Sequence, residues 1–323
     1  MTKLAFTSCM LVQRFDSQPV WQRIQAQDPD HLVLLGNAIH LDIDVAVRGM
    51  SAGEFAEHAH GLYRAQLAVP EFDALLRHMA AKGGRRVFAL WDDHDFLWHD
   101  AAGVAIERAA EHRDKIEPSR VLFRAFRQAL ADVGSFPARL GDVTPPPRPD
   151  DVPLHEAIAL RDDLWLHLTD GRSHRTDTWL VPQAERALLG PRQLDALATA
   201  IDTAAPGAVH LVASGSTSAH WRHYQRDWAS LGALAARHRL LLLSGDLLRN
   251  DFASHGGAHG RPLHEATASG AAARDAAIFG AEVENFAVAE IDAAQVVLRF
   301  FDRDGETAPR FIHRERWAVT AHA

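Results

Sequence analysis

Short apolar runs recur along the chain and alternate with segments in which apolar residues are spaced three or four positions apart. The runs have the length and composition of buried strands, and the spaced segments are typical of amphipathic helices. The runs in the first three quarters of the chain are Leu4–Thr7, His31–Leu35, Val87–Trp91, Leu164–Leu168, Val209–Ala213 and Leu240–Leu243. Helical spacing is found at Trp21–Ile24, at Gly53–Ala81 with a break near Pro70, at Ala101–Ala131 and after Gly190. This alternation predicts an α/β fold with parallel strands and right-handed crossovers.

The pattern changes in two places. Residues 137–153, with successive prolines at Pro145–Pro147, predict a stiff surface connection. Near the C-terminus, Val283–Ile291 and Val296–Phe301 alternate again, and Asp302–Gly305 predicts a turn. Strands between about residues 283 and 315 are therefore expected to be antiparallel and joined by hairpins. Neither feature marks a clear boundary, so we expect residues 1–323 to form a single domain.

The composition limits the class of protein and of partner. The chain has 323 residues, 47% hydrophobic and 24% charged, with a formal net charge of -8. This acidity argues against a nucleic-acid-binding surface, and no apolar run reaches the roughly eighteen residues of a membrane span. The N-terminal residues predict a strand rather than a signal peptide, and the single cysteine, Cys9, excludes an internal disulfide. We therefore expect a cytoplasmic protein, whose oligomeric state the sequence does not indicate.

The strongest chemical signal follows the strand predicted at Val87–Trp91. Asp92, Asp93, His94 and Asp95 come directly after it. Charge concentrated at the end of a buried strand is costly unless a cation compensates it, and carboxylates with imidazole are metal ligands. An alternative is a helix N-cap followed by an acidic first turn, which explains one aspartate but not the whole group.

Other predicted strands end in residues of similar chemistry. Cys9 follows the first strand, Asn37 and His40 follow the second, and Asp246 follows the run at Leu240–Leu243. In an open α/β sheet such residues meet at the carboxyl edge, where ligands bind. Each also has a simpler interpretation, because a lone cysteine is most often a small buried hydrophobe and an asparagine is common in turns.

Two arginines follow the strand predicted at Leu164–Leu168. Arg172 and Arg175 lie in the segment that begins at Asp170. Guanidinium groups beside such an edge could bind an anion such as phosphate. They could equally balance Asp170 and Asp177.

Taken in order, these motifs resemble those of the alkaline phosphatase D family, a branch of the calcineurin-like metallophosphoesterases. The resemblance extends from about residue 4 to residue 305, and its most specific element is Trp91-Asp92-Asp93-His94-Asp95. It implies a four-layer α/β/β/α sandwich with a two-metal centre that hydrolyses phosphate mono- or diesters. Members of the family are described with iron and calcium, and many are exported.

The resemblance also assigns residues. The positions that match the family's metal ligands and phosphate-binding arginines are Cys9, Asp92, Asp93, Asp246, Arg172 and Arg175. Four positions differ: Asn37 replaces an aspartate that usually bridges the metals, His40 a tyrosine, His99 an asparagine and Leu248 a histidine. Asn37 keeps an oxygen donor but loses a negative charge, whereas Leu248 has no donor. His40 and His99 keep donors and favour metals such as zinc or iron over calcium.

The remaining donors lead to a first hypothesis and two alternatives. We expect one metal ion to be held by some of Cys9, Asn37, His40, Asp92, Asp93, His99 and Asp246, with His255 or His259 able to replace a lost donor. The metal would be iron, zinc, manganese or calcium, and the substrate a small phosphoester. His94 would act as an acid or orient another group, while Arg172 and Arg175 bind the anion. The alternatives are a catalytically silent binding or regulatory protein and a plain α/β protein with polar turns.

Overall fold

A computed structural model describes residues 1–144, 153–275 and 281–320, and these form two large β-sheets that pack face to face. The first sheet has the order β16-β15-β13-β12-β1-β2-β3, with β14 beside β13. Its strands are β1 (Thr2–Thr7), β2 (His31–Leu35), β3 (Val87–Leu90), β12 (Phe286–Ile291), β13 (Gln295–Asp302), β14 (Gly305–Glu306), β15 (Arg310–His313) and β16 (Ala318–Thr320). The second sheet has the order β4-β5-β6-β7-β9-β8. Its strands are β4 (Glu156–Arg161), β5 (Leu164–Leu168), β6 (Val209–Ser214), β7 (Arg239–Ser244), β8 (Asp251–Gly256) and β9 (Pro262–Thr267).

Each sheet contains a block of parallel strands, which lies at one end of the first sheet and in the middle of the second. β1, β2 and β3 are parallel, and so are β5, β6, β7 and β9. The parallel pairing predicted from the strand–helix alternation is therefore confirmed. The C-terminal strands β12, β13, β15 and β16 are antiparallel, also as predicted. A separate short pair is formed by β10 (Ala273–Asp275) and β11 (Ala281–Val283).

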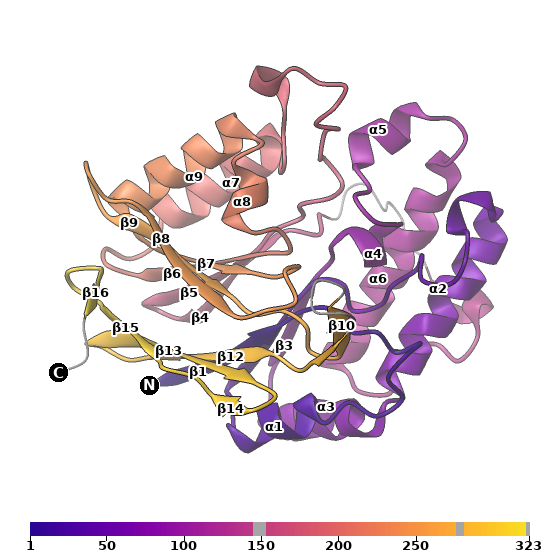
Figure 1. The fold of residues 1–323 in the computed structure, drawn as a ribbon, viewed down its shortest axis with the longest axis horizontal. Helices are drawn as coiled ribbons and strands as arrows, with labels where there is room; N and C mark the ends of the chain where they lie inside the picture. Colours follow the sequence, from indigo (N-terminus) through magenta and orange to yellow (C-terminus); the bar gives the residue numbers. More distant parts are fainter. Residues whose placement is uncertain (145–152, 276–280, 321–323) are drawn as a thin grey trace.

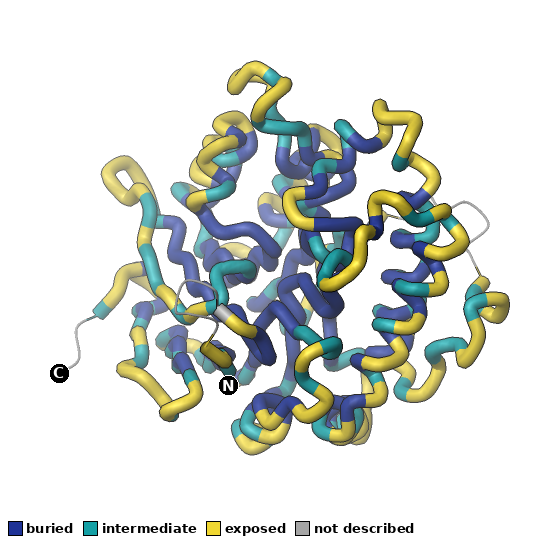
Figure 2. Tube along the Cα trace, turned by 45° about the vertical axis from the view of Figure 1, so that its right-hand side comes forward, coloured by how far each residue is buried: buried dark blue, intermediate teal, exposed yellow. Residues whose placement is uncertain are grey.

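Helices cover the outer face of each sheet (Figure 1). Those that pack on the first sheet are α1 (Val20–Ala26), α2 (Ala52–Leu67), α3 (Pro70–Ala81) and α6 (Ile116–Ala131). α7 (Pro191–Asp202) and α9 (Gln225–Arg237) pack on the second sheet, where α8 (Ser218–Trp221) also lies. Between the sheets is an apolar layer that includes Phe6, Val33, Leu166, Leu211 and Leu298, all fully buried. Figure 2 shows the buried segments gathered toward the centre. Two packed sheets with helices on their outer faces confirm the four-layer α/β/β/α arrangement.

The helical segments follow local signals closely. Ser51 caps α2 in a capping box with Glu54, and Pro70 occupies the first turn of α3, which explains the break predicted near this residue. The single helix predicted at Ala101–Ala131 is only partly correct. α5 (Gly103–Arg108) ends early because the chain becomes extended at Ala109, and α6 begins at Ile116.

Two further predictions concern the chain as a whole. The central part of the proline-rich connection at residues 137–153 lies outside the described residues. Among the described residues, no helix has both the length and the apolar character needed to cross a membrane.

Candidate metal centre

The candidate ligands lie at the carboxyl ends of parallel strands from both sheets, where the chain turns sharply. Cys9 follows β1, Asn37 follows β2, Asp92 follows β3 and Asp246 follows β7. Cys9, Asn37 and Asp246 adopt left-handed backbone conformations, with φ of 61°, 53° and 75°. Such conformations are uncommon outside glycine and concentrate at functional sites, where the surrounding structure enforces them. The turns bring side chains from both sheets to one edge.

Two glycines pack so closely against Asp92 that neither glycine position has room for a side chain. A Cβ on Gly36 would lie 2.6 Å from the Asp92 Cβ, and a Cβ on Gly215 would lie 2.5 Å from its Cγ. Gly36 also has a φ of 94°, which favours glycine. The two turns therefore fix the position of the Asp92 carboxylate.

Three carboxylates meet at this edge. Oxygen atoms of Asp92, Asp93 and Asp246 lie within 4.8 Å of one another. Asp92 Oδ2 is buried and has no hydrogen-bond partner among the described residues. Burial and the charges of Asp92 and Asp93 raise the pKa of Asp246 to about 7. Three carboxylates at this spacing repel one another unless a proton or a cation balances their negative charge.

Arg172 supplies part of that charge. Its Nε lies 2.6 Å from Asp92 Oδ1, and its Nη2 lies 3.7 Å from Asp93 Oδ1. The guanidinium is buried, and it also donates to the carbonyl of Ala101. Although burial opposes ionisation of Asp93, Arg172 and His99 hold the pKa of this carboxyl well below its usual range. Arg172 thus faces the carboxylates in this structure.

Cys9 and Asn37 extend the cluster on one side. Asn37 Nδ2 lies 3.3 Å from Asp93 Oδ1 and 3.8 Å from Cys9 Sγ, so its amide lies between the carboxylate and the sulfur. The hydroxyls of Ser8 and Ser269 donate to the same sulfur. Burial and the charge of Asp246 raise the pKa of Cys9 to about 12, which keeps it a thiol unless a cation is bound nearby.

Histidines lie on the other side of Asp93. Ligand atoms of Asp93, His94 and His99 form a second group within 4.8 Å, so Asp93 belongs to both groups. His94 stacks between His99 and His40, with ring centroids 5.4 and 4.5 Å away. The His40 Nδ1 lies 3.1 Å from the carbonyl of Met10. His40 therefore packs against the ring of His94 and belongs to neither of the two groups of potential metal ligands among the described residues.

Two acidic or basic residues near the centre were missed from the sequence. Asp42 Oδ1 lies 2.5 Å from His94 Nδ1, and its other oxygen accepts the backbone N–H of His99. Although burial opposes protonation of His94, Asp42 raises its pKa. His220 Nδ1 lies 3.7 Å from Asp246 Oδ2. Asp42 follows His40 in the same turn, which is a signal that could have been noticed, whereas nothing in the sequence points to His220.

The remaining candidate donors lie elsewhere. His255 is in β8 and pairs with Glu265 at 2.9 Å, and His259 is exposed in the turn between β8 and β9. Neither joins the two groups within the described part of the chain. Leu248 adopts a φ of 52° and leaves its position without a side-chain donor. The expectation that a histidine of this hairpin replaces a lost ligand is therefore not supported.

Asp170 holds the arginine segment in place. Its Oδ1 accepts the indole N–H of Trp91 at 2.7 Å and the backbone N–H groups of Arg172 and Ser173. In the described structure Asp170 accepts these N–H groups and not the arginine guanidinium groups, so it orders the backbone of the segment rather than balancing the arginine charges. Arg175 differs from Arg172, since its guanidinium donates to Ser216 and lies 5.7 Å from the ring of Tyr224.

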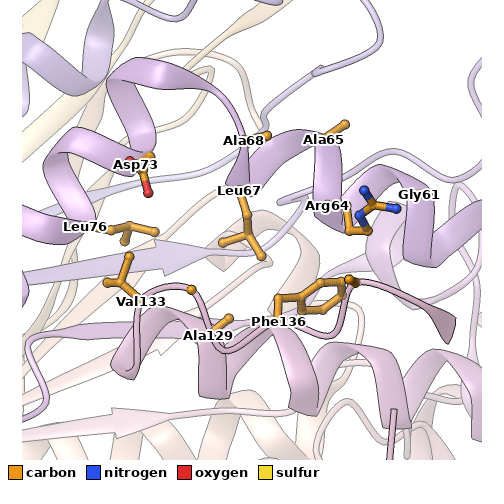
Figure 3. Close-up of a pocket in the computed structure, with 12 residues that line it drawn as sticks. Gly61, Arg64, Ala65, Leu67, Ala68, Asp73, Leu76, Ala129, Val133 and Phe136 are labelled. Carbon is orange, nitrogen blue, oxygen red and sulfur yellow. The ribbon is translucent and has the colours of Figure 1, made fainter. Parts of the chain in front are cut away.

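A cavity of about 370 Å³ adjoins the centre. Its lining includes Arg175, together with His220 beside Asp246 and Asp100, whose backbone N–H donates to Asp93 Oδ2. A second cavity of about 500 Å³ lies between α2, α3 and α6 (Figure 3). That cavity is lined mainly by apolar side chains such as Leu67, Leu76 and Phe136, and neither of the two ligand groups found among the described residues faces it. The smaller cavity is therefore the one relevant to the chemistry of the centre.

Comparison with solved structures identifies the fold. A structure entitled "Structure of PhoD" matches with a TM-score of 0.64 and 16% sequence identity, covering 100% of this chain and 72% of that chain. The chain has the PhoD fold. This confirms the fold that the motif order implied. No family model and no curated protein matches the sequence. At such low identity the likeness to PhoD concerns the fold, so the chemistry of this chain must be argued from its own residues.

The side chains at this edge of the sheets are suited to binding a metal ion. The buried Asp92 Oδ2 lacks a partner among the described residues, and it lies within a triad of carboxylates at coordinating spacing. Asn37 and Cys9 add an amide oxygen and a sulfur close by, although the Asn37 oxygen currently accepts the N–H of His94. Carboxylate, imidazole and thiol donors together suit a transition metal better than calcium.

Proposed function

We propose that this protein is a metal-dependent hydrolase of phosphate mono- or diesters, acting at a centre that differs from that of the alkaline phosphatase D family. The observation that carries the proposal is the buried Asp92 carboxylate. Its Oδ2 has no hydrogen-bond partner among the described residues, and one of its two oxygens lies within 4.8 Å of ligand atoms of Asp93 and Asp246. Burying unpaired carboxylate charge costs several kcal/mol or more, and a bound cation removes this cost.

Asp92, Asp93 and Asp246 would hold the metal, and His99 beside Asp93 could contribute. Cys9 belongs to neither group of described ligand atoms and would need Asn37, 3.8 Å from its sulfur, to move aside before it could bind the same ion. When bound, the ion supplies Lewis acidity and a lowered pKa for a coordinated water. Asp93 belongs to both groups of potential ligands, so it is the residue whose loss should affect the centre most.

The protein's own side chains would bind the phosphate and move protons. Arg175 lines the cavity and would offer its guanidinium to a phosphate oxygen, while Arg172 pairs with Asp92 and lowers the pKa of Asp93. His94 is held by Asp42 at 2.5 Å, which favours its protonated form and suits a general acid for the leaving oxygen.

One observation favours a second candidate, a phosphatase-like protein without activity. The Arg172 guanidinium and the Asn37 amide already lie against the carboxylates, at 2.6 and 3.3 Å from Asp92 Oδ1 and Asp93 Oδ1. These groups partly take the role that a cation would have. In such a protein the edge would bind phosphoesters without hydrolysing them.

Elemental analysis and a hydrolysis assay distinguish the two. The hydrolase hypothesis expects bound metal in the purified protein and hydrolysis of an aryl phosphate, both of which Asp93→Asn strongly reduces. Asp73→Asn is the matched control, because Asp73 lies on α3 and pairs with Arg77. A metal-free protein that stays inert with added manganese, iron or zinc would contradict the hydrolase hypothesis. Gain of activity in an Asn37→Asp, Leu248→His double variant would then support the silent alternative.

A further inference from the structure

One tryptophan is presented to solvent in a way that packing does not explain. Trp179 is 93% exposed, although large aromatic side chains normally bury most of their surface. It lies in the loop of residues 176–187, between β5 and α7, which rises at the top of Figure 1. Its neighbour Leu180 is 81% exposed. A single exposed apolar residue needs no explanation by itself, so the case for Trp179 depends on the cavity that it lines.

The loop is held by its own hydrogen bonds. Thr176 and Ala187 pair across its base, where the Thr176 N–H donates to the Ala187 carbonyl at 2.9 Å. Arg186 donates to the carbonyls of Val181 and Thr178. Asp177 accepts the backbone N–H of Trp179 at 2.6 Å. The indole is thus carried by a closed loop of defined conformation.

Trp179 lines the cavity that adjoins the candidate metal centre. The same lining includes His220, which lies 3.7 Å from Asp246, and Arg175, while Trp179 and Tyr224 contribute aromatic surface. Tyr224 is buried, and its ring faces the Arg175 guanidinium at 5.7 Å. A volume of about 370 Å³ lies within the usual range of small-molecule sites. The cavity therefore combines a guanidinium group, residues in direct contact with the candidate ligands Asp93 and Asp246, and an exposed aromatic face.

We infer that the site takes phosphoesters whose leaving group carries a flat aromatic ring, and that this ring packs on Trp179. The inference rests on the proposed function for the position of the phosphate, which Arg175 would bind. Hydrolysis would break the bond from phosphorus to the ester oxygen, with one water supplying the hydroxyl to phosphorus and a proton to the aryl alcohol. Trp179 is a specificity residue in this scheme, since it touches the ring and not the reacting atoms.

Binding of two unreactive probes tests the inference without relying on catalysis. Phenylphosphonate and methylphosphonate share the anionic group and differ in the ring, and calorimetric titration gives the affinity of each. We expect the wild-type protein to prefer phenylphosphonate by about threefold to tenfold, the usual range for an aromatic contact. Trp179→Ala should remove this preference and leave methylphosphonate binding unchanged, whereas Trp179→Phe should retain most of it.

Leu180→Ala is the matched control, because Leu180 is equally prominent in the loop but does not line the cavity. It should keep the preference for phenylphosphonate. An equal loss in Leu180→Ala, equal affinity of the wild type for the two probes, or binding of neither would overturn the inference. So would a wild-type dimer in sedimentation that Trp179→Ala converts to monomer, since the tryptophan would then serve self-association. A retained preference in a protein that hydrolyses no phosphoester would refute the proposed function and leave the aromatic subsite standing.

Discussion

The fit between Gly215 and Asp92 allows the geometry of the centre to be tested through protein stability. Replacing Gly215 by alanine would place a Cβ 2.5 Å from Asp92 Cγ and 2.8 Å from Asp92 Oδ1. Gly215 does not have a left-handed φ, so the alanine backbone itself is not strained. The whole effect should therefore come from displacing the carboxylate, by about 1 Å to restore ordinary contact distances.

This displacement would weaken the hydrogen bond from Arg172 Nε to Asp92 Oδ1, which is 2.6 Å long and buried. A buried hydrogen bond to a charged group contributes about 1.5–3 kcal/mol, and overpacking costs about 1–3 kcal/mol. Since moving the carboxylate relieves part of the clash, we expect a loss of about 2–4 kcal/mol in the free energy of unfolding. For 323 residues at about 2.1 cal/mol/K per residue, a loss of about 3 kcal/mol lowers Tm by roughly 4 °C.

Urea unfolding and calorimetry of Gly215→Ala measure this loss, and elemental analysis shows whether metal is lost as well. Gly232→Ala is the control, because Gly232 lies within α9 and a Cβ there meets nothing within 4 Å. The control should gain about 0.5–1 kcal/mol from the higher helix propensity of alanine. Unchanged stability and metal content in Gly215→Ala would refute the enclosed position of Asp92.

Three further results are expected. Arg172→Met should destabilise the protein by about 3–5 kcal/mol, because it leaves buried carboxylates unpaired. Added manganese should raise the Tm of this variant more than that of the wild type, which scanning fluorimetry can measure. Burial and His210 lower the pKa of His167 to about 3 from 6.5, so unfolded chains bind a proton that the native protein refuses, and stability should fall as pH drops below about 6.5. The loss from this group is roughly 2 kcal/mol at pH 5, and His167→Gln should show a smaller difference between urea midpoints at pH 7 and pH 5 than the wild type. Cys9, buried and with its pKa raised to about 12, should resist a thiol-specific disulfide reagent in the native protein and react once urea unfolds it; rapid native labelling would contradict the environment described for the sulfur.

The sequence by itself determined the central strands and the residues that follow them. His31–Leu35 is β2 to the residue, and Leu240–Leu243 lies inside β7, because a short apolar run between polar turns has no stable alternative to burial. The last two strands of the second sheet, β9 and β8, were harder to predict. β8 has the sequence DFASHG, with largely exposed or half-exposed residues, and the buried positions of β9 include His264 and Glu265. Such strands form because a neighbour supplies their hydrogen bonds, which no local pattern records.

Only the tertiary structure decided how the polar residues meet. The order of motifs placed Asp92, Asp93 and Asp246 at strand ends, but their approach within 4.8 Å depends on the packing of two sheets. The same packing turned Arg172 toward the carboxylates, Arg175 toward the cavity and Trp179 toward solvent. The apolar central strands can be predicted because their pattern lies within a few neighbouring residues. Ion pairs, packing contacts and access to a cavity instead join residues that can be a hundred or more positions apart in the sequence. For that reason the ligand types were predictable from the chain, and their partners were not.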